Sequence, residues 1–383
     1  MQRKGNIIAR KNQGEKLVTV GIDMGGLLWA TSVRDWTDDK EHYYGLKNKT
    51  DRSKEKQLFE KVKELTETGN KVEVFYEAGR YGYWPARIMK EIGAEVHILP
   101  INKMKVVMCG KVIKTDKLDA KFLGGLHPDD KLPEVYIPTL EEEGRRDAER
   151  ELQRLKTSIC RANDQIIGIL ERTPLETPCG HRNSKMWMRY LEKEIKKETL
   201  KKIPVLMIKR LKNLVEELEV FEKHSDEWEK TITERMEKDR VQAEVNGEIL
   251  TADKLKKFKG IGEIISRHFA WEIGDFKRFG NGKKFASYFG LTPCPYSSGT
   301  MSREQGISKS GRKSLRKTAV ELAWLWVKWQ PESFLTKKWM PKLSQKGRAR
   351  RTAIVALARQ LLVALWRHIV HDEPVAGAII KTV

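Results

Sequence analysis

Cysteine is scarce in this chain, and its spacing excludes two classes of small cross-linked domain. The 383 residues contain four cysteines, and no two of them form a C-x-x-C pair. A disulfide framework and a zinc ribbon both need closely spaced cysteines, so we expect neither. The usage fits a reducing compartment, and we expect a cytoplasmic protein. The cysteines are Cys109, Cys160, Cys179 and Cys294.

Long apolar runs are also missing. The longest apolar stretch, Ala353–Trp366, is interrupted by Arg359 and Gln360. A helix that spans a bilayer needs about 20 mostly apolar residues, so this stretch predicts a core helix and no membrane partner. The first residues are polar and basic, which is not the pattern of a secretory signal.

Acidic residues are outnumbered by basic ones. The chain has 74 Lys and Arg against 53 Asp and Glu, a net charge of +21. A charge of this size favours a polyanionic partner, because binding releases counterions and the protein's field steers association. The alternative is a protein that is basic for solubility or because it associates with ribosomes. The length is sufficient for two or three domains.

The first section, residues 1–138, alternates strand and helix patterns, which predicts an α/β domain with a mixed or parallel sheet. The predicted strands are Leu17–Ile22, its hairpin partner Leu28–Val33, Val72–Tyr76 and Glu95–Leu99, and the predicted helices are Lys54–Thr68 and a short one near residues 85–92.

Four carboxylates in this section are placed for metal chemistry. Asp23 and Glu77 each follow an apolar strand, and Asp116 and Asp119 are three residues apart. The second pair shares one face if its segment is helical. Acids from two strand ends and one helix face can converge into a Mg²⁺ site, which polarises a phosphate and activates an attacking oxygen.

The middle section, residues 139–250, carries two long apolar stripes with the spacing of a heptad seam. The first extends from Leu152 to Ile169, and the second, which is apolar except at Ser225, extends from Met207 to Ile232. We therefore expect a long antiparallel helical (coiled-coil) arm. Such arms often mediate dimerisation. The alternative is a helical hairpin that packs on its own protomer.

The last section, residues 251–383, is predicted to be mainly α-helical. Gly260 and Gly262 form a Gly-x-Gly turn between two short helices. The backbone N–H groups of such a turn and the start of the next helix can hold a nucleic-acid phosphate. A plain tight turn explains the same residues.

In the last section we expect a Gly/Pro-rich loop that places serines among cations. The segment begins at Gly290 and includes Ser297 and Ser298. A hydroxyl among cations is suited to attack a phosphodiester, because the cations stabilise the charge that develops on the phosphoryl oxygens. Alternatively, the serines only donate hydrogen bonds to a bound phosphate. The cations are Arg303, Lys309, Arg312, Lys313 and Arg316.

These pieces, in this order, resemble the IS110-family transposases of bacterial insertion sequences, over nearly the whole chain. Gly21–Asp23, Tyr76–Gly79 and Lys114–Ala120 look like the family's DEDD motif on a RuvC-like, RNase H-type fold. The segments that look like the family's second domain, which carries a catalytic serine, are Tyr296–Gly299, Gly306–Lys309 and Leu315–Arg316.

The resemblance implies a mechanism and partners. Asp23, Glu77, Asp116 and Asp119 would hold Mg²⁺, with Mn²⁺ as a substitute, and Ser298 would form a phosphoserine link to DNA. Ser297 stays open as the nucleophile. The implied partners are donor and target DNA, a structured non-coding guide RNA, and further copies of the chain as a dimer, with a tetramer in synapsis. The implied location is the nucleoid of a bacterium or archaeon.

Three other functions would explain part of this set of motifs. A DEDD nuclease or junction resolvase would have the same fold and would cleave DNA with activated water alone. An ATPase of the actin type would use Gly21–Gly26 as a phosphate loop, but it leaves Lys114–Ala120 and the serine segment unexplained. A non-catalytic nucleic-acid-binding protein would need neither the acids nor the serine.

Overall fold

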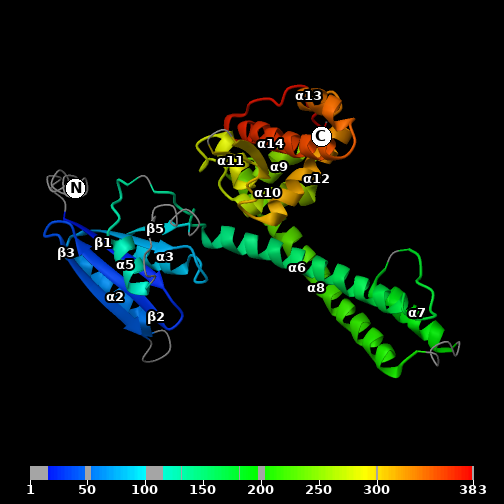
Figure 1. Cartoon of the computed structure of the whole chain (residues 1–383), viewed down its shortest axis with the longest axis horizontal. Helices are drawn as coiled ribbons and strands as arrows, with labels where there is room; N and C mark the ends of the chain where they lie inside the picture. The colour runs from blue at the N-terminus through cyan, green and yellow to red at the C-terminus, as the bar shows by residue number, and fades with distance from the viewer. Residues whose placement is uncertain are drawn as a thin grey trace. The chain divides into compact units, whose positions relative to one another are not determined.

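The computed structural model describes residues 16–47, 53–100, 115–130, 132–180, 182–196, 203–298 and 301–381, without the side chains of residues 195–196, 295–298 and 301–304. The chain divides into two compact units, Met1–Thr139 and Leu140–Val383, and each is described by itself (Figure 1). The three-domain division at residues 138/139 and 250/251 stays a prediction.

The N-terminal unit is built on a mixed sheet of five strands in the order β3-β2-β1-β4-β5. The first three strands form an antiparallel meander, and β4 and β5 then add in parallel to β1. The sequence predicted a mixed or parallel sheet, and the sheet is mixed. The edge strand β3 was missed because its mostly exposed, polar residues lack an apolar pattern. The strands are β1 (Leu17–Met24), β2 (Leu28–Asp35), β3 (Lys40–Lys47), β4 (Lys71–Glu77) and β5 (Glu95–Leu99).

Helices cover both faces of this sheet. On one face, α2 (Ser53–Glu67) and α3 (Trp84–Glu91) pack on a core that alternate residues of β1 and β4 supply. On the other face lies α5 (Asp116–Gly124), whose Leu123 packs against Phe75 of β4. Alternation along the strands separates the two faces.

A glycine allows α5 to approach the sheet closely. A Cβ atom on Gly21 of β1 would lie 2.0 Å from the backbone nitrogen of Gly124 and 2.3 Å from the carbonyl oxygen of Ala120. The end of the helix is held by Thr19, whose hydroxyl donates to the Gly124 carbonyl at 2.5 Å. The segment that begins at Asp116 is therefore helical, which is the condition for Asp116 and Asp119 to share a face, and it is fixed to β1.

The C-terminal unit begins with two long helices, α6 (Leu140–Leu170) and α8 (Val205–Val245), joined through α7 (Ser184–Lys196). Figure 1 shows α8 running back along α6, with α7 packed beside them at the far end. The fully buried Trp187 of α7 lies in the core of that end, and its indole N–H donates to Asn163 of α6 at 2.7 Å. The predicted pair of long helices is present.

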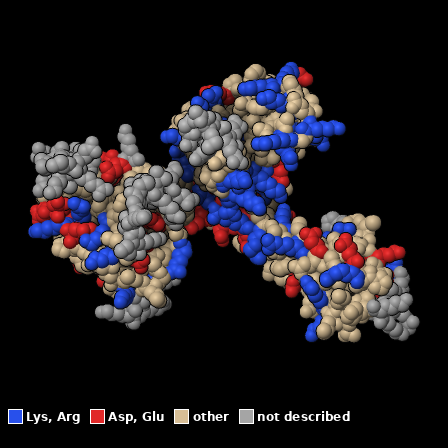
Figure 2. All heavy atoms as spheres, in the orientation of Figure 1, with Lys and Arg blue, Asp and Glu red and all other residues tan. Residues whose placement is uncertain are grey.

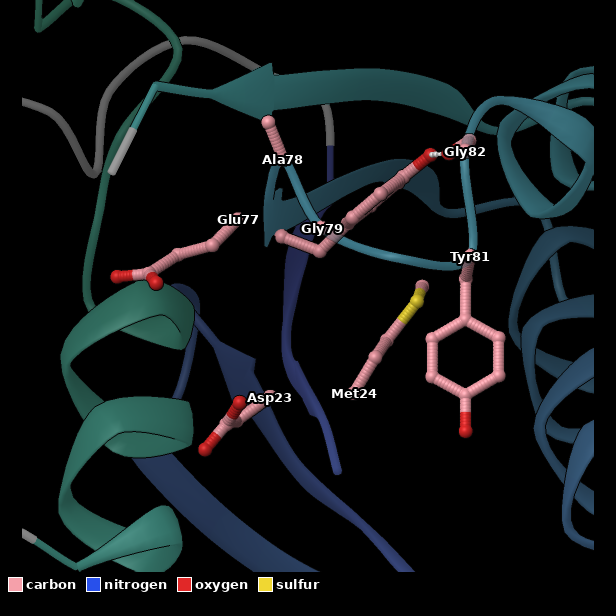
Figure 3. A pocket seen from close by; sticks show the side chains of 8 residues that line it. Asp23, Met24, Glu77, Ala78, Gly79, Tyr81 and Gly82 are labelled. Atoms are coloured by element: carbon pink, nitrogen blue, oxygen red, sulfur yellow. Dashed lines mark hydrogen bonds between the residues drawn. The ribbon is translucent and has the colours of Figure 1, made fainter. Parts of the chain in front are cut away.

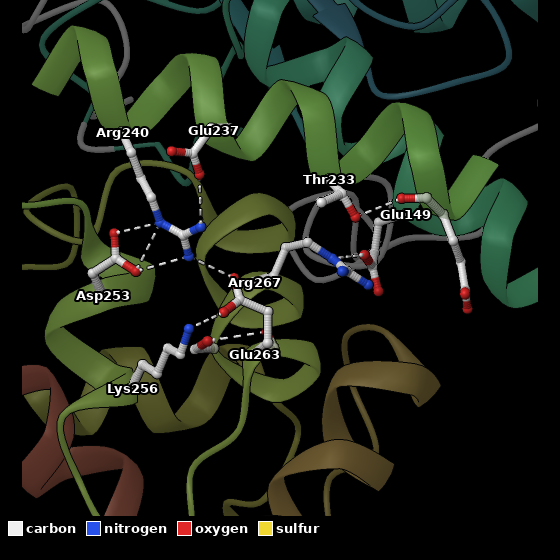
Figure 4. Close-up of polar contacts among 10 residues, drawn as sticks. Glu149, Thr233, Glu237, Arg240, Asp253, Lys256, Glu263 and Arg267 are labelled. Carbon is white, nitrogen blue, oxygen red and sulfur yellow. Dashed lines mark hydrogen bonds and ion pairs between the residues drawn. The ribbon is translucent and has the colours of Figure 1, made fainter. Parts of the chain in front are cut away.

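At the other end, half-buried and buried ion pairs fix the long helices to α9 (Thr251–Lys256) and α10 (Glu263–Ile273). Arg240 of α8 bonds both Asp253 and Glu263, with shortest distances of 3.1 and 2.7 Å, as Figure 4 shows. Arg267 of α10 contacts Glu149 of α6 at 2.9 Å. Burial would raise the pKa of the Glu149 carboxyl, but His268 and Arg267 outweigh burial and lower it. Charged groups are tolerated in such a place because they are paired.

The rest of the unit is a mainly helical body around α14 (Arg348–His371). Among the described residues, α14 is the one helix long and apolar enough to cross a membrane, and half of its apolar window is buried. Its apolar side packs on α11 and α12, as expected of a core helix. The other elements are α11 (Gly282–Tyr288), β6 (Pro293–Ser298), β7 (Met301–Ile307), α12 (Lys313–Trp329) and α13 (Phe334–Leu343).

Candidate active site

Two of the predicted carboxylates lie at the same level on neighbouring strands. In the parallel pair of β1 and β4, Ile22 is opposite Tyr76, and Asp23 and Glu77 each come one residue later. Because facing residues of parallel strands project to one side of a sheet, both acids point to the same face. Gly21, two residues before Asp23 on the same strand, faces α5, so this is the face that α5 covers. Figure 3 shows both carboxylates directed toward that helix.

The other two acids occupy the first turn of α5. Thr115 caps this turn, since its hydroxyl accepts a hydrogen bond from the N–H of Leu118 at 3.3 Å. The Asp116 carboxylate reaches the turn that follows β1, where Oδ2 would lie 3.9 Å from a Cβ on Gly25. Asp116 is exposed and Asp119 half-buried. The first turn of α5 thus lies at the same end of the sheet as the two strand acids.

An open pocket with about 400 Å³ of empty space lies between the strand ends and the loops that follow them. In Figure 3, Asp23 and Glu77 are on one side of it and Met24 and Tyr81 on the other. Carboxylate oxygens are the ligands that Mg²⁺ and Mn²⁺ prefer. The four acids are therefore of the type that such an ion prefers and share this end of the sheet, but among the described residues no three of them bring their carboxylate oxygens within 4.8 Å of one another.

A second group of possible ligands lies elsewhere on the sheet. Ligand atoms of Glu73, Glu95 and His97 lie within 4.8 Å of one another. Glu73 is four residues before Glu77 on the same strand face, about 13 Å away at the rise of a strand. Its carboxylate already contacts Nε2 of His97 at 2.6 Å and Nζ of Lys71 at 3.0 Å. The Glu73 carboxylate is therefore already paired with neighbouring basic groups, and this group contains none of the four predicted ligands.

Sequence reasoning missed two residues beside the pocket. Lys54, in the first turn of α2, is only 2% exposed, and its ammonium donates to the hydroxyl of Tyr81 at 3.2 Å. Burial would raise the pKa of Tyr81, but the neighbouring Trp29 and the hydrogen bonds from Arg80 and Lys54 outweigh it and lower that pKa. The sequence carries no local signal for these contacts, because a lysine at the start of a helix is usually solvated.

The predicted serine segment forms a β-hairpin of β6 and β7. Ser298, opposite Met301, ends β6 at the turn, and Ser297 pairs with Ser302. The side chains of Ser297, Ser298 and Arg303 lie outside the described residues. The structure therefore places the backbone of the predicted nucleophile at the tip of a two-stranded hairpin.

The remaining cations of the predicted set separate into two kinds. Lys309 and Lys313 are exposed. Arg316 instead donates to the carbonyl oxygen of Lys309 at 3.2 Å, and Arg312 donates to the hydroxyl of Ser314 at 2.8 Å. Arg312 also lies 3.4 Å from the buried carboxylate of Glu272. The two half-buried arginines hold the base of the hairpin, whereas the two lysines face solvent.

The Gly-x-Gly turn joins α9 to α10, as expected. Gly260 has a φ of +94° and packs against Trp329, whose Cβ would lie 2.9 Å from an added Cβ. Gly262 is the N-cap of α10, and nothing lies within 4 Å of a Cβ added there. Lys and Arg side chains also gather on the visible face of the helical body, with few acids among them (Figure 2). The open backbone at Gly262 and the basic face of the helical body each suit contact with a polyanion.

Comparison with known proteins matches this chain to transposases and to a pilin gene-inverting protein. Residues 252–337 match the family model described as "Transposase IS116/IS110/IS902 family". "Putative transposase y4rJ" of Sinorhizobium fredii is 29% identical over 332 residues, which are 81% of this chain and 80% of the relative. "Transposase for insertion sequence element IS1328" of Yersinia enterocolitica is 40% identical over 73 residues, 19% and 22% of the two chains. "Pilin gene-inverting protein" of Moraxella bovis is 31% identical over 124 residues, 32% and 38% of the two chains.

Proposed function

Because this chain belongs to the IS110 family of transposases, we propose that it cuts and rejoins the DNA of an insertion sequence with a metal-assisted serine nucleophile. The observation that carries the metal part is the register of β1 and β4, which sets Asp23 beside Glu77 at the end of the sheet where α5 begins. The strand order and the helix that covers β1 support a RuvC-like fold for this unit.

Four carboxylates would hold the metal. Asp23 and Glu77 contribute from the strand ends, and Asp116 and Asp119 contribute from the first turn of α5. When bound, Mg²⁺ polarises the scissile phosphate and stabilises the charge that develops on its oxygens. The chain's own part is to keep the acids together. The N-terminus of α5 helps because its dipole favours negative charge nearby.

Ser298 is proposed to attack the phosphate. Its Oγ forms the bond to phosphorus while a bond from phosphorus to a deoxyribose oxygen breaks, so one strand end becomes attached to the protein. The energy of the broken bond is kept in the phosphoserine link and serves the rejoining step without ATP. The position of Ser298 at the hairpin tip, and of Lys309 and Lys313 on the segment after it, supports this role.

Nucleic-acid recognition would be shared between the protein and a guide RNA. The RNA pairs with donor and target DNA, and the protein contacts backbones and shape. The net charge of +21 supports such broad backbone contact. We also propose that α6 and α8 associate with a second copy of the chain to give a dimer, with a tetramer in synapsis.

Excision in cells tests the proposal. The gene in its native flanks, with any RNA-coding sequence retained, is compared with Asp23→Ala, Ser298→Ala and Ser297→Ala, the last as a matched control on the adjacent serine. Wild type and Ser297→Ala should yield circular element junctions, and the other two should yield none. In vitro, labelled DNA should become attached to wild type and not to Ser298→Ala on a denaturing gel.

Other outcomes select a different mechanism. Junctions from Ser298→Ala but not from Ser297→Ala would move the nucleophile by one residue. Cleavage with Mg²⁺ by both serine variants, with no attached DNA, would indicate a nuclease that uses water. Unchanged excision by Asp23→Ala would exclude a role for the carboxylate site.

A further inference from the structure

Lys54 is the only buried lysine among the residues that the structure describes. It is 2% exposed, and its Nζ lies 5.4 Å from the centre of the Trp29 ring and 5.5 Å from that of Tyr81. Burying an ammonium group is costly unless hydrogen bonds satisfy it. An apolar side chain of equal length would fill the same space at lower cost, so the charge has a use that packing alone does not explain.

The contacts of Lys54 join the two loops that follow the metal-site strands. Its ammonium donates to the carbonyl oxygen of Gly26 at 2.5 Å, in the turn after β1, and to the hydroxyl of Tyr81, in the loop after β4, at 3.2 Å. The Tyr81 hydroxyl donates in turn to the carbonyl oxygen of Gly25 at 3.0 Å. A longer bond from the ammonium to the carbonyl oxygen of Gly25, at 3.5 Å, closes this set of four groups, which we name the Lys54–Tyr81 clasp.

The clasp is close in sequence to both strand acids. Gly25 comes two residues after Asp23, and Tyr81 comes four residues after Glu77. The pairing of β1 with β4 ends at Ile22 and Tyr76. Each acid is held by its outer neighbour instead, Asp23 opposite Ala30 of β2 and Glu77 opposite Leu99 of β5, so the β1–β4 register does not extend to the two acids. The clasp links the turn after β1 to the loop after β4, where Arg80 also lies close to Gly26.

We propose that the Lys54–Tyr81 clasp sets the spacing of Asp23 and Glu77, which makes Lys54 and Tyr81 positioning residues of the metal site. This inference rests on the proposed function, since it requires the acids to bind a metal. Removing a group that orients a metal ligand without contacting the metal itself typically changes metal affinity or activity by about 10- to 100-fold. The clasp acts through the backbone, so we expect the lower end of that range.

The test measures Mn²⁺ binding to the full chain by titration calorimetry, without nucleic acid. Lys54→Met and Tyr81→Phe should each bind Mn²⁺ roughly tenfold more weakly. The double variant should be no weaker than the worse single one, because either change opens the same clasp. Lys63→Met, on the same helix with a 63% exposed side chain, is the matched control and should bind like wild type.

Amide exchange gives a readout that needs no metal. Protection of the turn at Gly25–Leu28 should fall in both clasp variants and stay unchanged in Lys63→Met. Tyr81→Phe keeps the aromatic ring and leaves Lys54 in place. If Lys54→Met does not fold, the clasp proposal is therefore tested with Tyr81→Phe alone.

The outcomes separate the clasp from the metal site. If Asp23→Ala binds Mn²⁺ as wild type does, the proposed metal site is wrong and the clasp proposal fails with it. If Asp23→Ala loses binding while Tyr81→Phe matches Lys63→Met in affinity and exchange, the metal site stands and the clasp proposal alone is overturned. Additive effects in the double variant would likewise refute a shared clasp.

Discussion

Replacing Gly21 with alanine should displace α5 and the acids that it carries. The added Cβ would lie 2.0 Å from the Gly124 nitrogen and 2.3 Å from the Ala120 oxygen. Both are backbone atoms, so no side-chain rotation relieves the contact. The helix must move away from β1, and Asp116 and Asp119 move with its first turn.

The size of the displacement follows from the contact distances. Ordinary contact of a Cβ atom begins at 3.4 Å, so the nearest atom must retreat by about 1.4 Å (3.4 − 2.0). Overpacking typically costs about 1–3 kcal/mol, and we expect the upper end because backbone must shift. A misplacement of about 1 Å can lower a rate by about 100-fold, so excision should fall at least that far.

Gly45→Ala is the matched control, because Gly45 is on β3 of the same sheet. A Cβ there would meet only side-chain ends, Leu28 Cδ1 at 3.4 Å and Tyr43 Oη at 3.7 Å. Stability is best read from amide exchange in β1 and α5, since two units need not unfold together. We expect Gly21→Ala to lower the opening free energy there by about 3 kcal/mol, and Gly45→Ala to change it by less than about 1 kcal/mol. Equal protection and equal excision in the two variants would refute the packing argument.

Two further predictions concern charge. Burial alone would lower the pKa of His97, but its bonds to the carboxylates of Glu73 and Glu134 raise it. The stability that His97 contributes is therefore complete below its ordinary pKa of 6.5 and is lost as the pH rises through the raised pKa. The pKa of Glu73 is lowered, so its contribution is complete above 4.5 and is lost as the pH falls through the lowered value. The melting-temperature difference between wild type and His97→Gln should be largest between about pH 4.5 and 6.5 and should shrink toward pH 9, and a difference independent of pH would contradict this. Lys309→Ala and Lys313→Ala should each reduce the slope of log affinity for DNA against log salt by about 1, whereas an unchanged slope would show that these lysines contact no phosphate.

The acids at the strand ends were predictable because the signal is local. An apolar strand followed by an acid specifies a carboxylate at a sheet end, and Asp23 and Glu77 meet because their strands pair in parallel. The helix at Asp116 was also predictable, since a threonine cap precedes it. In contrast, the serine segment was expected to be a loop and is a hairpin. Its prolines concealed the strands, and the register shift between Pro293 and Pro295 shows how the ladder accommodates them.

The groups that hold the site in place depend on tertiary contacts, and sequence patterns do not carry those. Arg312 looks like its exposed neighbour Lys313 in a basic run, yet it contacts a buried carboxylate 40 residues earlier, at Glu272 (312 − 272). Lys54 starts an ordinary helix, yet it bonds a turn 28 residues before it. A search guided by motifs alone would stop at the four acids and the serine. If the clasp sets the spacing of the acids, then variants that never touch a ligand should change metal affinity, and the motif would be necessary for the site without being sufficient.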